Sequence, residues 1–128
     1  MTQLECTTWP ENEAPSGTIT FLDMIDQSEE ILEDWPGTML VHCSAGVGRT
    51  GTFIGLYKLI KDYQNKVRVW VDGIGFDAYQ YQVAELDPFE TVLTMRRQRV
   101  KMVQKPLQYH YMIKCLADYV VGETSEYV

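Results

Sequence analysis

A thiol and a guanidinium stand at the two ends of a short glycine-containing segment, where together they could act on a phosphate group. Residues 41–51 read VHCSAGVGRTG, and Arg49 follows Cys43 by six residues. A cysteine is a useful nucleophile only as its thiolate. An arginine can hold two phosphate oxygens at once through its planar guanidinium, which a lysine does less specifically. The pair therefore predicts in-line attack of Cys43 on phosphorus to give a cysteinyl-phosphate.

The residues between the thiol and the guanidinium predict a loop that binds an anion through its backbone. A short apolar strand is expected at 38–42, and a helix is expected a few residues after Cys43. A loop bent between two such elements can point N–H groups inward at a helix N-terminus. Gly46, Gly48 and Gly51 allow the backbone angles that this shape needs. The positive electrostatic field of these N–H groups would lower the pKa of Cys43 and stabilise the phosphate oxygens during attack.

Two residues beside the loop have expected supporting roles. Thr50 can donate its hydroxyl to the sulfur and ease its departure in the second step, and His42 is interpreted as a structural hydrogen-bonding residue that tunes the thiolate. A nucleotide-binding Walker A loop is excluded because the segment lacks the required lysine. A buried cysteine beside a glycine turn would explain Cys43 alone, but not the histidine, arginine and threonine around it.

Length, charge and composition limit the other possibilities. The 128 residues suffice for one domain at most, and the net charge of −7 argues against binding nucleic acid through broad phosphate attraction. No stretch approaches the ~18 consecutive apolar residues of a membrane span, and the N-terminus has no basic segment followed by an apolar one. The chain is therefore expected to be neither exported nor membrane-spanning, with a cytoplasmic location.

Cysteine and histidine usage argues against a zinc site and a disulfide framework. Cys6, Cys43 and Cys115 are widely spaced without a C-x-x-C pair, and His42 and His110 are far apart. This pattern fits a reducing compartment, with Cys6 and Cys115 as core thiols.

The periodicity predicts an α/β protein in which an incomplete mixed sheet is flanked by helices, with the phosphate loop between a strand and a central helix. Strands are expected at 3–9 and 38–42, too few to bury the faces of a sheet. The expected helices begin near residues 18, 49, 88 and 106, and residues 122–128 form a polar tail. Residues 67–85 are the least readable segment, with alternating valines and a possible hairpin turn.

Three motifs resemble those of the protein tyrosine phosphatases. HCSAGVGRTG (42–51) resembles the signature H-C-x-x-G-x-G-R-[ST]-G. TTWPENEAP (7–15) resembles the mobile loop that carries the general acid, usually read as W-P-D, and RRQRVKMVQKPLQYHY (96–111) resembles the glutamine segment. The motifs lie in family order and cover most of the chain outside 67–85. The resemblance implies a cysteine-phosphatase fold that acts on phosphotyrosine-containing proteins without a metal or cofactor.

The resemblance also implies a role for each matching residue. Cys43 would be the nucleophile and Arg49 the phosphate-binding arginine, while Trp9 would anchor the hinge of the acid loop. Gln104 and Gln108 would position the water that hydrolyses the cysteinyl-phosphate. The substrate phosphate would contact the loop residues Ser44, Ala45, Gly46, Val47 and Gly48, together with Arg49 and Gln108.

Glu11 departs from the family pattern, because it stands where the general acid is usually an aspartate. It keeps a carboxylic acid, but the extra methylene displaces the proton, and small errors of position can cost about a hundredfold in rate. Such a glutamate is similar to that in the second domains of receptor-type members. The alternative is therefore a low-activity or inactive domain that binds phosphotyrosine or a neighbouring phosphatase domain. A dual-specificity or lipid phosphatase would share only the C-x5-R loop.

Residues 1–121 are shorter than the domains of this family and match only their C-terminal half. The expected interpretation is a partial catalytic domain with its N-terminal half absent, in which 67–85 is a possible insertion. We expect such a chain to fold poorly by itself, since half of the sheet is missing. A receptor-type and a non-receptor parent both fit the sequence.

Overall fold

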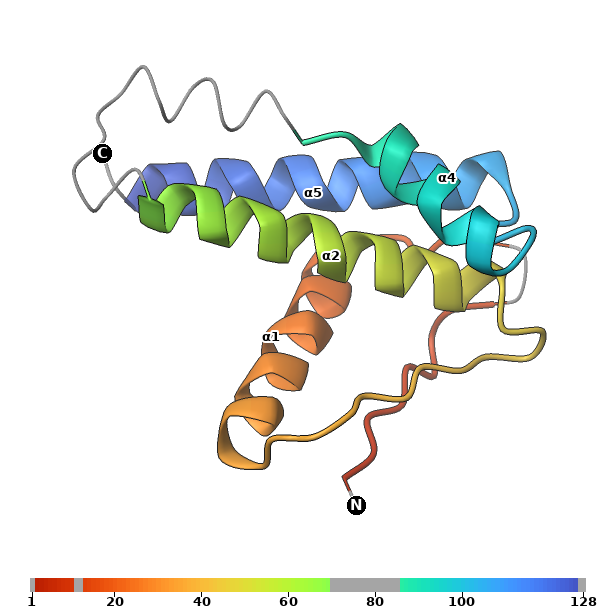
Figure 1. Ribbon diagram of the computed structural model, residues 1–128, viewed down its shortest axis with the longest axis horizontal. Coiled ribbons are helices and arrows are strands. Elements are labelled where there is room, and N and C mark those ends of the chain that lie inside the picture. The colour runs from red at the N-terminus through yellow and green to blue at the C-terminus, as the bar shows by residue number, and fades with distance from the viewer. Residues whose placement is uncertain (1, 11–12, 70–85, 127–128) are drawn as a thin grey trace.

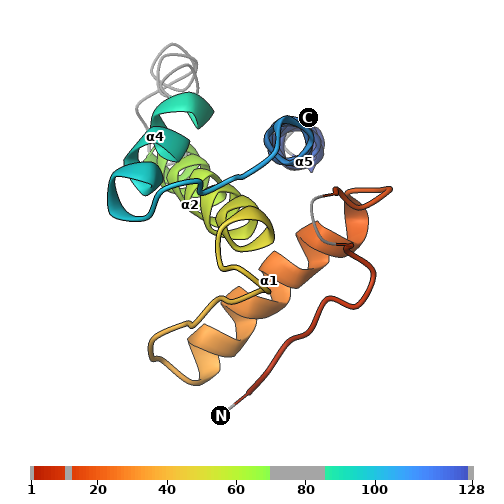
Figure 2. The ribbon, with the colours of Figure 1, turned by 90° about the vertical axis from the view of Figure 1, so that its right-hand side faces the viewer.

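The computed structural model describes residues 2–10, 13–69 and 86–126, and within them the chain forms four α-helices. These are α1 (Ile19–Asp34), α2 (Gly48–Val69), α4 (Pro88–Gln98) and α5 (Pro106–Glu126). Helices α2 and α5 run side by side, α4 packs on α2, and α1 lies at a steep angle to them and contacts α5 (Figure 1; Figure 2). None of the helices in this part of the chain is both long and apolar enough to cross a membrane.

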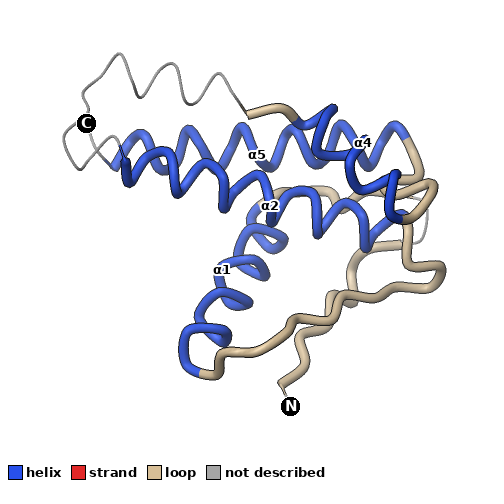
Figure 3. Tube along the Cα trace, in the orientation of Figure 1, coloured by secondary structure: helices blue, strands red, loops and turns tan. Residues whose placement is uncertain are grey.

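The predicted α/β fold with an incomplete mixed sheet is wrong for the residues that the structure describes. Residues 3–9 and 38–42 form no strand, and Figure 3 shows both as loop. A strand is stabilised by pairing its backbone with a neighbouring strand, and no such neighbour exists within the described ranges. The side chain of Leu40 is 86% exposed, so the apolar run at 38–42 is not buried as the prediction required. The phosphate loop therefore follows an irregular segment, although a helix does come after it.

Helix α2 is the centre of the hydrophobic core, as the sequence predicts. It packs against α5 along much of its length and against α4, and full burial of each large apolar side chain contributes about 1.5–3 kcal/mol. Its buried apolar residues are Phe53, Leu56, Leu59, Ile60 and Tyr63, which meet Val92 and Met95 of α4 and Met112, Cys115 and Leu116 of α5.

The start predicted near residue 88 is confirmed for α4, and residues that favour a helix boundary are clear there and at the end of α1. The Asp87 side chain accepts a hydrogen bond from the backbone N–H of Glu90 at 3.0 Å, and Pro88 occupies the first turn of α4. Helix α1 ends at Asp34, two residues before Pro36, which cannot continue a helix.

The C-terminal ends of two helices, α2 and α5, extend into segments that were not predicted to be helical. Helix α2 continues to Val69, so the first of the alternating valines are helical rather than part of a strand. The rest of the possible insertion, 70–85, lies outside the described residues. Helix α5 extends to Glu126 and so includes most of the segment 122–128 that was expected as a tail.

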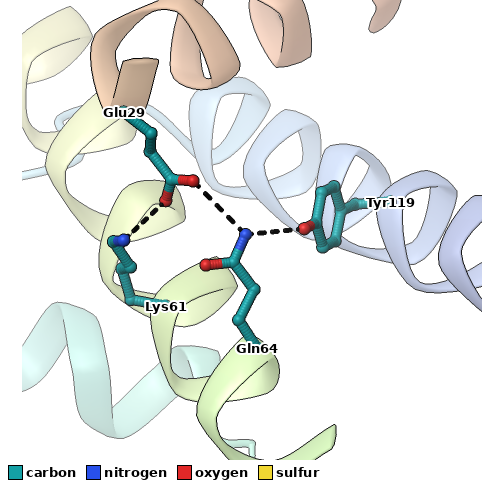
Figure 4. A network of polar contacts seen from close by, with 4 residues as sticks. All are labelled: Glu29, Lys61, Gln64 and Tyr119. Atoms are coloured by element: carbon teal, nitrogen blue, oxygen red, sulfur yellow. Dashed lines mark hydrogen bonds and ion pairs between the residues drawn. The ribbon is translucent and has the colours of Figure 1, made fainter. Parts of the chain in front are cut away.

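A polar network joins α1, α2 and α5 away from the apolar core (Figure 4). Lys61 Nζ lies 3.0 Å from Glu29 Oε1, and the hydrogen bond with Glu29 raises the pKa of Lys61. Gln64 Nε2 donates to the Tyr119 hydroxyl at 2.8 Å and, more weakly, to Glu29 Oε2 at 3.5 Å. The network fixes the position of α1 relative to the two long helices.

Candidate active site

The segment between Cys43 and the first turn of α2 directs hydrogen-bond donors at the cysteine sulfur. Gly46 N donates to Cys43 Sγ at 3.3 Å, and Thr50 Oγ1 donates to it at 3.0 Å. Partial burial by itself would raise the pKa of Cys43. The hydrogen bonds from the Thr50 hydroxyl and from the N–H groups of Thr50, Gly46 and Val47 outweigh burial and lower this pKa below its ordinary value. At a given pH, the thiolate of Cys43 is therefore more populated than that of an isolated cysteine.

The backbone of the loop is shaped for this arrangement. Gly46 has φ of +74°, in the left-handed region that glycine enters without steric cost. Helix α2 begins at Gly48, and the first N–H groups of a helix have no partners within it. These N–H groups and the positive end of the helix dipole stabilise an anion that lies in front of the N-terminus of α2.

The guanidinium of Arg49 connects the loop to the segment that carries the predicted acid. Its Nη2 donates to Ser44 Oγ at 2.9 Å and its Nη1 donates to the carbonyl oxygen of Trp9, also at 2.9 Å. Both acceptors are neutral, and no carboxylate among the described residues pairs with this arginine. Its charge is therefore available to an anion bound in the loop.

Trp9 is held firmly in the core. The side chain is 6% exposed, its Nε1 donates to the Glu13 carbonyl oxygen at 2.6 Å, and its ring meets those of Phe21 and Tyr111 at centroid distances of 5.0 and 5.9 Å. Glu11 lies outside the described residues, so the structure places Trp9 and Glu13 but not the predicted acid itself.

The two glutamines lie at the N-terminal end of α2. A Cβ built on Gly48 would lie 2.9 Å from Gln108 Nε2 and 3.4 Å from Gln104 Oε1. Gln108 is fully buried, and its Oε1 accepts a hydrogen bond from Lys105 N at 3.1 Å. Its Nε2 is buried without a hydrogen-bond partner among the described residues. A buried amide donor left unpaired costs about 1–3 kcal/mol, so its position favours an acceptor at this end of the helix.

Comparison with known proteins identifies the family. Residues 1–118 match the model of the family described as protein-tyrosine phosphatase. The chain belongs to this family. The resemblance inferred from the three motifs is thereby confirmed.

Receptor-type members are among the relatives of this protein-tyrosine phosphatase sequence. It is 34% identical over 122 residues to receptor-type tyrosine-protein phosphatase V of Rattus norvegicus, covering 93% of the chain and 6% of the relative. It is 32% identical over 126 residues to receptor-type tyrosine-protein phosphatase epsilon of Homo sapiens, covering 98% and 16%. It is 34% identical over 120 residues to tyrosine-protein phosphatase Lar of Drosophila melanogaster, covering 92% and 5%. The chain thus spans only a small part of each relative.

The residue that was predicted to tune the thiolate, His42, is not hydrogen-bonded to the Cys43 sulfur. His42 is exposed and makes no hydrogen bond to Cys43 or to any other described residue. The sulfur instead receives its hydrogen bonds from Gly46 and Thr50. No group of three or more His, Cys, Asp or Glu side chains in the described ranges is arranged to hold a metal ion.

Two arginines near the end of α4 had no predicted role, and they bind backbone carbonyl groups of the phosphate loop and of the turn after α4. Arg99 Nη2 donates to the Ala45 carbonyl oxygen at 2.9 Å. Arg96 donates to the carbonyl oxygens of Met102 and Val103 at 2.9 and 2.7 Å. The R-x-x-R spacing was visible in the sequence, and residues three apart at the end of a helix can lie on one face. The spacing alone did not indicate which backbone they bind.

Gly51 is expected to be intolerant of a side chain. A Cβ there would lie 2.4 Å from Val103 N and 3.1 Å from Met102 C, and both neighbours are backbone atoms that cannot rotate away. Val103 N also donates to the Val47 carbonyl oxygen at 2.9 Å, so the two segments are fixed together. We expect Gly51→Ala to lower the free energy of unfolding by about 2–3 kcal/mol.

Urea unfolding followed by circular dichroism tests this expectation, with Gly122→Ala as the matched control. A Cβ on Gly122, near the end of α5, would have none of the described atoms that lie outside its own helix turn within 4 Å. An alanine there is expected to raise the free energy of unfolding by about 0.5–1 kcal/mol through helix propensity. Equal effects of the two substitutions would contradict the close approach at Gly51.

Proposed function

We propose that the chain acts within a protein tyrosine phosphatase that hydrolyses phosphotyrosine in proteins through a cysteinyl-phosphate. The observation that carries this proposal is the placement of Cys43 Sγ, which accepts hydrogen bonds from Gly46 N and Thr50 Oγ1 at the start of α2. Arg49 spans the same loop through Ser44. Membership of the family supports the same chemistry.

In the first step, the thiolate of Cys43 forms a bond to phosphorus while the bond from phosphorus to the tyrosine oxygen breaks. The loop N–H groups and Arg49 stabilise the charge on the other phosphate oxygens. The leaving phenolate takes a proton from Glu11, a role assigned by the position of this residue two after Trp9 in the family motif.

In the second step, water attacks phosphorus and transfers a proton to the Glu11 carboxylate left by the first step, while the bond to sulfur breaks and phosphate is released. Gln108, whose buried amide donor has no hydrogen-bond partner among the described residues, and Gln104 would orient this water beside Gly48. The hydroxyl of Thr50, 3.0 Å from the sulfur, stabilises the departing thiolate.

The alternative function is a domain of low or no activity that binds phosphotyrosine or a neighbouring phosphatase domain. Glu11 in place of the usual aspartate favours it, because the longer side chain displaces the proton to be donated. Both functions use the same anion-binding loop, so only turnover separates them. In either case we propose a cytoplasmic location, on the inner side of the membrane if the parent protein is receptor-type.

We also propose that residues 1–121 work as part of a longer catalytic domain. The relatives are far longer than the chain, which covers 5% of the Lar protein and 16% of the epsilon protein. The exposed apolar Leu40, in a segment that lacks a strand partner within the described ranges, is consistent with this proposal.

Turnover of a phosphotyrosyl peptide tests the proposed function, measured as phosphate release by the chain within its parent polypeptide. We expect the unmodified protein to exceed Cys43→Ser, and Glu11→Asp to increase the rate by about tenfold to a hundredfold. An unmodified rate equal to that of Cys43→Ser, with recovery in Glu11→Asp, would select the binding-domain alternative. A peptide that is neither bound nor hydrolysed by any of the variants would contradict both hydrolysis and binding of phosphotyrosine.

A further inference from the structure

Arg99 contacts the phosphate loop from outside the loop itself. It is the residue immediately after α4, and its Nη2 donates to the Ala45 carbonyl oxygen at 2.9 Å. Its guanidinium also lies against Gly46: a Cβ built there would meet Nη2 at 3.6 Å and Cζ and Nε at 3.9 Å. The cation therefore lies beside the peptide unit that joins these two residues.

This peptide unit has the cation at one end and the nucleophile at the other. The carbonyl of Ala45 and the N–H of Gly46 belong to the same planar trans peptide, so they point in opposite directions. The carbonyl accepts from Arg99, while the N–H donates to Cys43 Sγ at 3.3 Å. A charged donor on the oxygen strengthens the hydrogen bond and polarises the amide, which makes its N–H a better donor.

We propose that Arg99 is a positioning residue for the Cys43 nucleophile, holding and polarising the Ala45–Gly46 peptide so that its N–H stabilises the thiolate. The proposal rests on the proposed function, because it concerns the same nucleophile. It adds a second arginine to the chemistry of the loop, one that acts on the sulfur through one peptide unit rather than on the substrate phosphate.

The basic side chains within the loop segment 41–51 are Arg49 and His42. Arg49, from α2, reaches the loop through Ser44 Oγ, and its role is to bind the phosphate oxygens. His42 precedes Cys43 in the chain and its side chain is exposed without a hydrogen bond to the sulfur. Arg99, from the end of α4, is thus the cation attached to the peptide that donates to the thiolate.

The neighbouring arginines of α4 supply a matched control. Arg97 is exposed and pairs with Glu90 at 3.5 Å, away from the loop. Arg96 donates hydrogen bonds to two carbonyl oxygens of the turn after α4 and is therefore unsuitable as a control. Substituting Arg97 removes the same charge from the same helix end without touching the phosphate loop.

The experiment measures the rate of Cys43 alkylation by iodoacetamide between pH 4.5 and 9.5 on the chain within its parent polypeptide, with the modified site located by peptide mass spectrometry. In Arg99→Met we expect the midpoint of the profile to move to higher pH and the rate at pH 6 to fall about threefold. The plateau at high pH is expected to stay unchanged, because access to the sulfur is the same. Arg99→Lys should lie between, and Arg97→Met should match the unmodified chain.

The outcomes separate this inference from the proposed function. An unmodified midpoint like that of a free cysteine would contradict the proposed function itself. A low unmodified midpoint that is unchanged in Arg99→Met would overturn only the role of Arg99. A uniform change in rate at every pH would assign Arg99 to packing and would also overturn it. If Arg99→Met loses its helical circular dichroism, Arg99→Lys decides: a raised midpoint supports the role and an unchanged midpoint rejects it.

Discussion

Replacing Cys43 by serine is expected to abolish hydrolysis of a phosphotyrosyl peptide, with a loss of at least about 10⁴-fold in kcat. A serine hydroxyl is not ionised at neutral pH, and the described contacts of this residue include no base that could remove its proton. The Gly46 N–H and the Arg49 guanidinium are unaffected by the substitution. Binding of the peptide is therefore expected to remain.

Phosphate release and isothermal titration with the same peptide measure the two halves of this prediction. Cys6→Ser is the control, because Cys6 is partly buried against the core and its hydrogen-bond contact is a weak one of 4.0 Å with Thr8, so the substitution is expected to leave kcat unchanged. Substantial hydrolysis by Cys43→Ser would place the nucleophile elsewhere. Equal losses in both variants would indicate a general effect of removing a thiol.

Replacing Arg49 by lysine is expected to reduce kcat/KM by about 10²–10³-fold although the positive charge is kept. The guanidinium donates from two nitrogens in different directions, to Ser44 Oγ and to the Trp9 carbonyl oxygen. A lysine ammonium is a single point donor and cannot make both contacts while holding two phosphate oxygens. The orientation of the arginine, rather than its charge alone, is therefore predicted to matter.

Steady-state kinetics checks this prediction, with Arg97→Lys as the control. Arg97 is exposed, and its ion-pair partner within the described ranges is Glu90, so its replacement is expected to leave kcat/KM within about twofold. A rate for Arg49→Lys close to that of the unmodified protein would show that a positive charge is sufficient. The bidentate role assigned to Arg49 would then be wrong.

The helices could be predicted from the sequence because their signals are local. Asp87 and Pro88, for example, mark the start of α4 through contacts within one turn. The sheet could not be predicted correctly, because a strand depends on a partner elsewhere. An apolar run such as 38–42 carries no information on whether that partner strand exists. The described ranges contain no such strand, and Leu40 is exposed.

The same distinction applies to the candidate site. Cys43, Arg49 and Thr50 lie within eight residues, so their chemistry could be inferred from the loop alone. Trp9 contacts Arg49 across 40 residues, and only the family motif suggested that it belongs to the site. Arg99 binds the Ala45 carbonyl across 54 residues, a contact with a backbone atom that no spacing rule reveals.

Trapping the covalent intermediate tests directly whether Cys43 attacks phosphorus. The parent polypeptide is mixed with a phosphotyrosyl peptide, quenched in acid within milliseconds, and digested for mass spectrometry. We predict a phosphoryl group on the peptide containing Cys43, absent from Cys43→Ser and increased in Gln108→Ala, in which attack by water should be slower. Phosphate release without this adduct, or with the phosphoryl group on a different residue, would contradict attack by Cys43 on phosphorus.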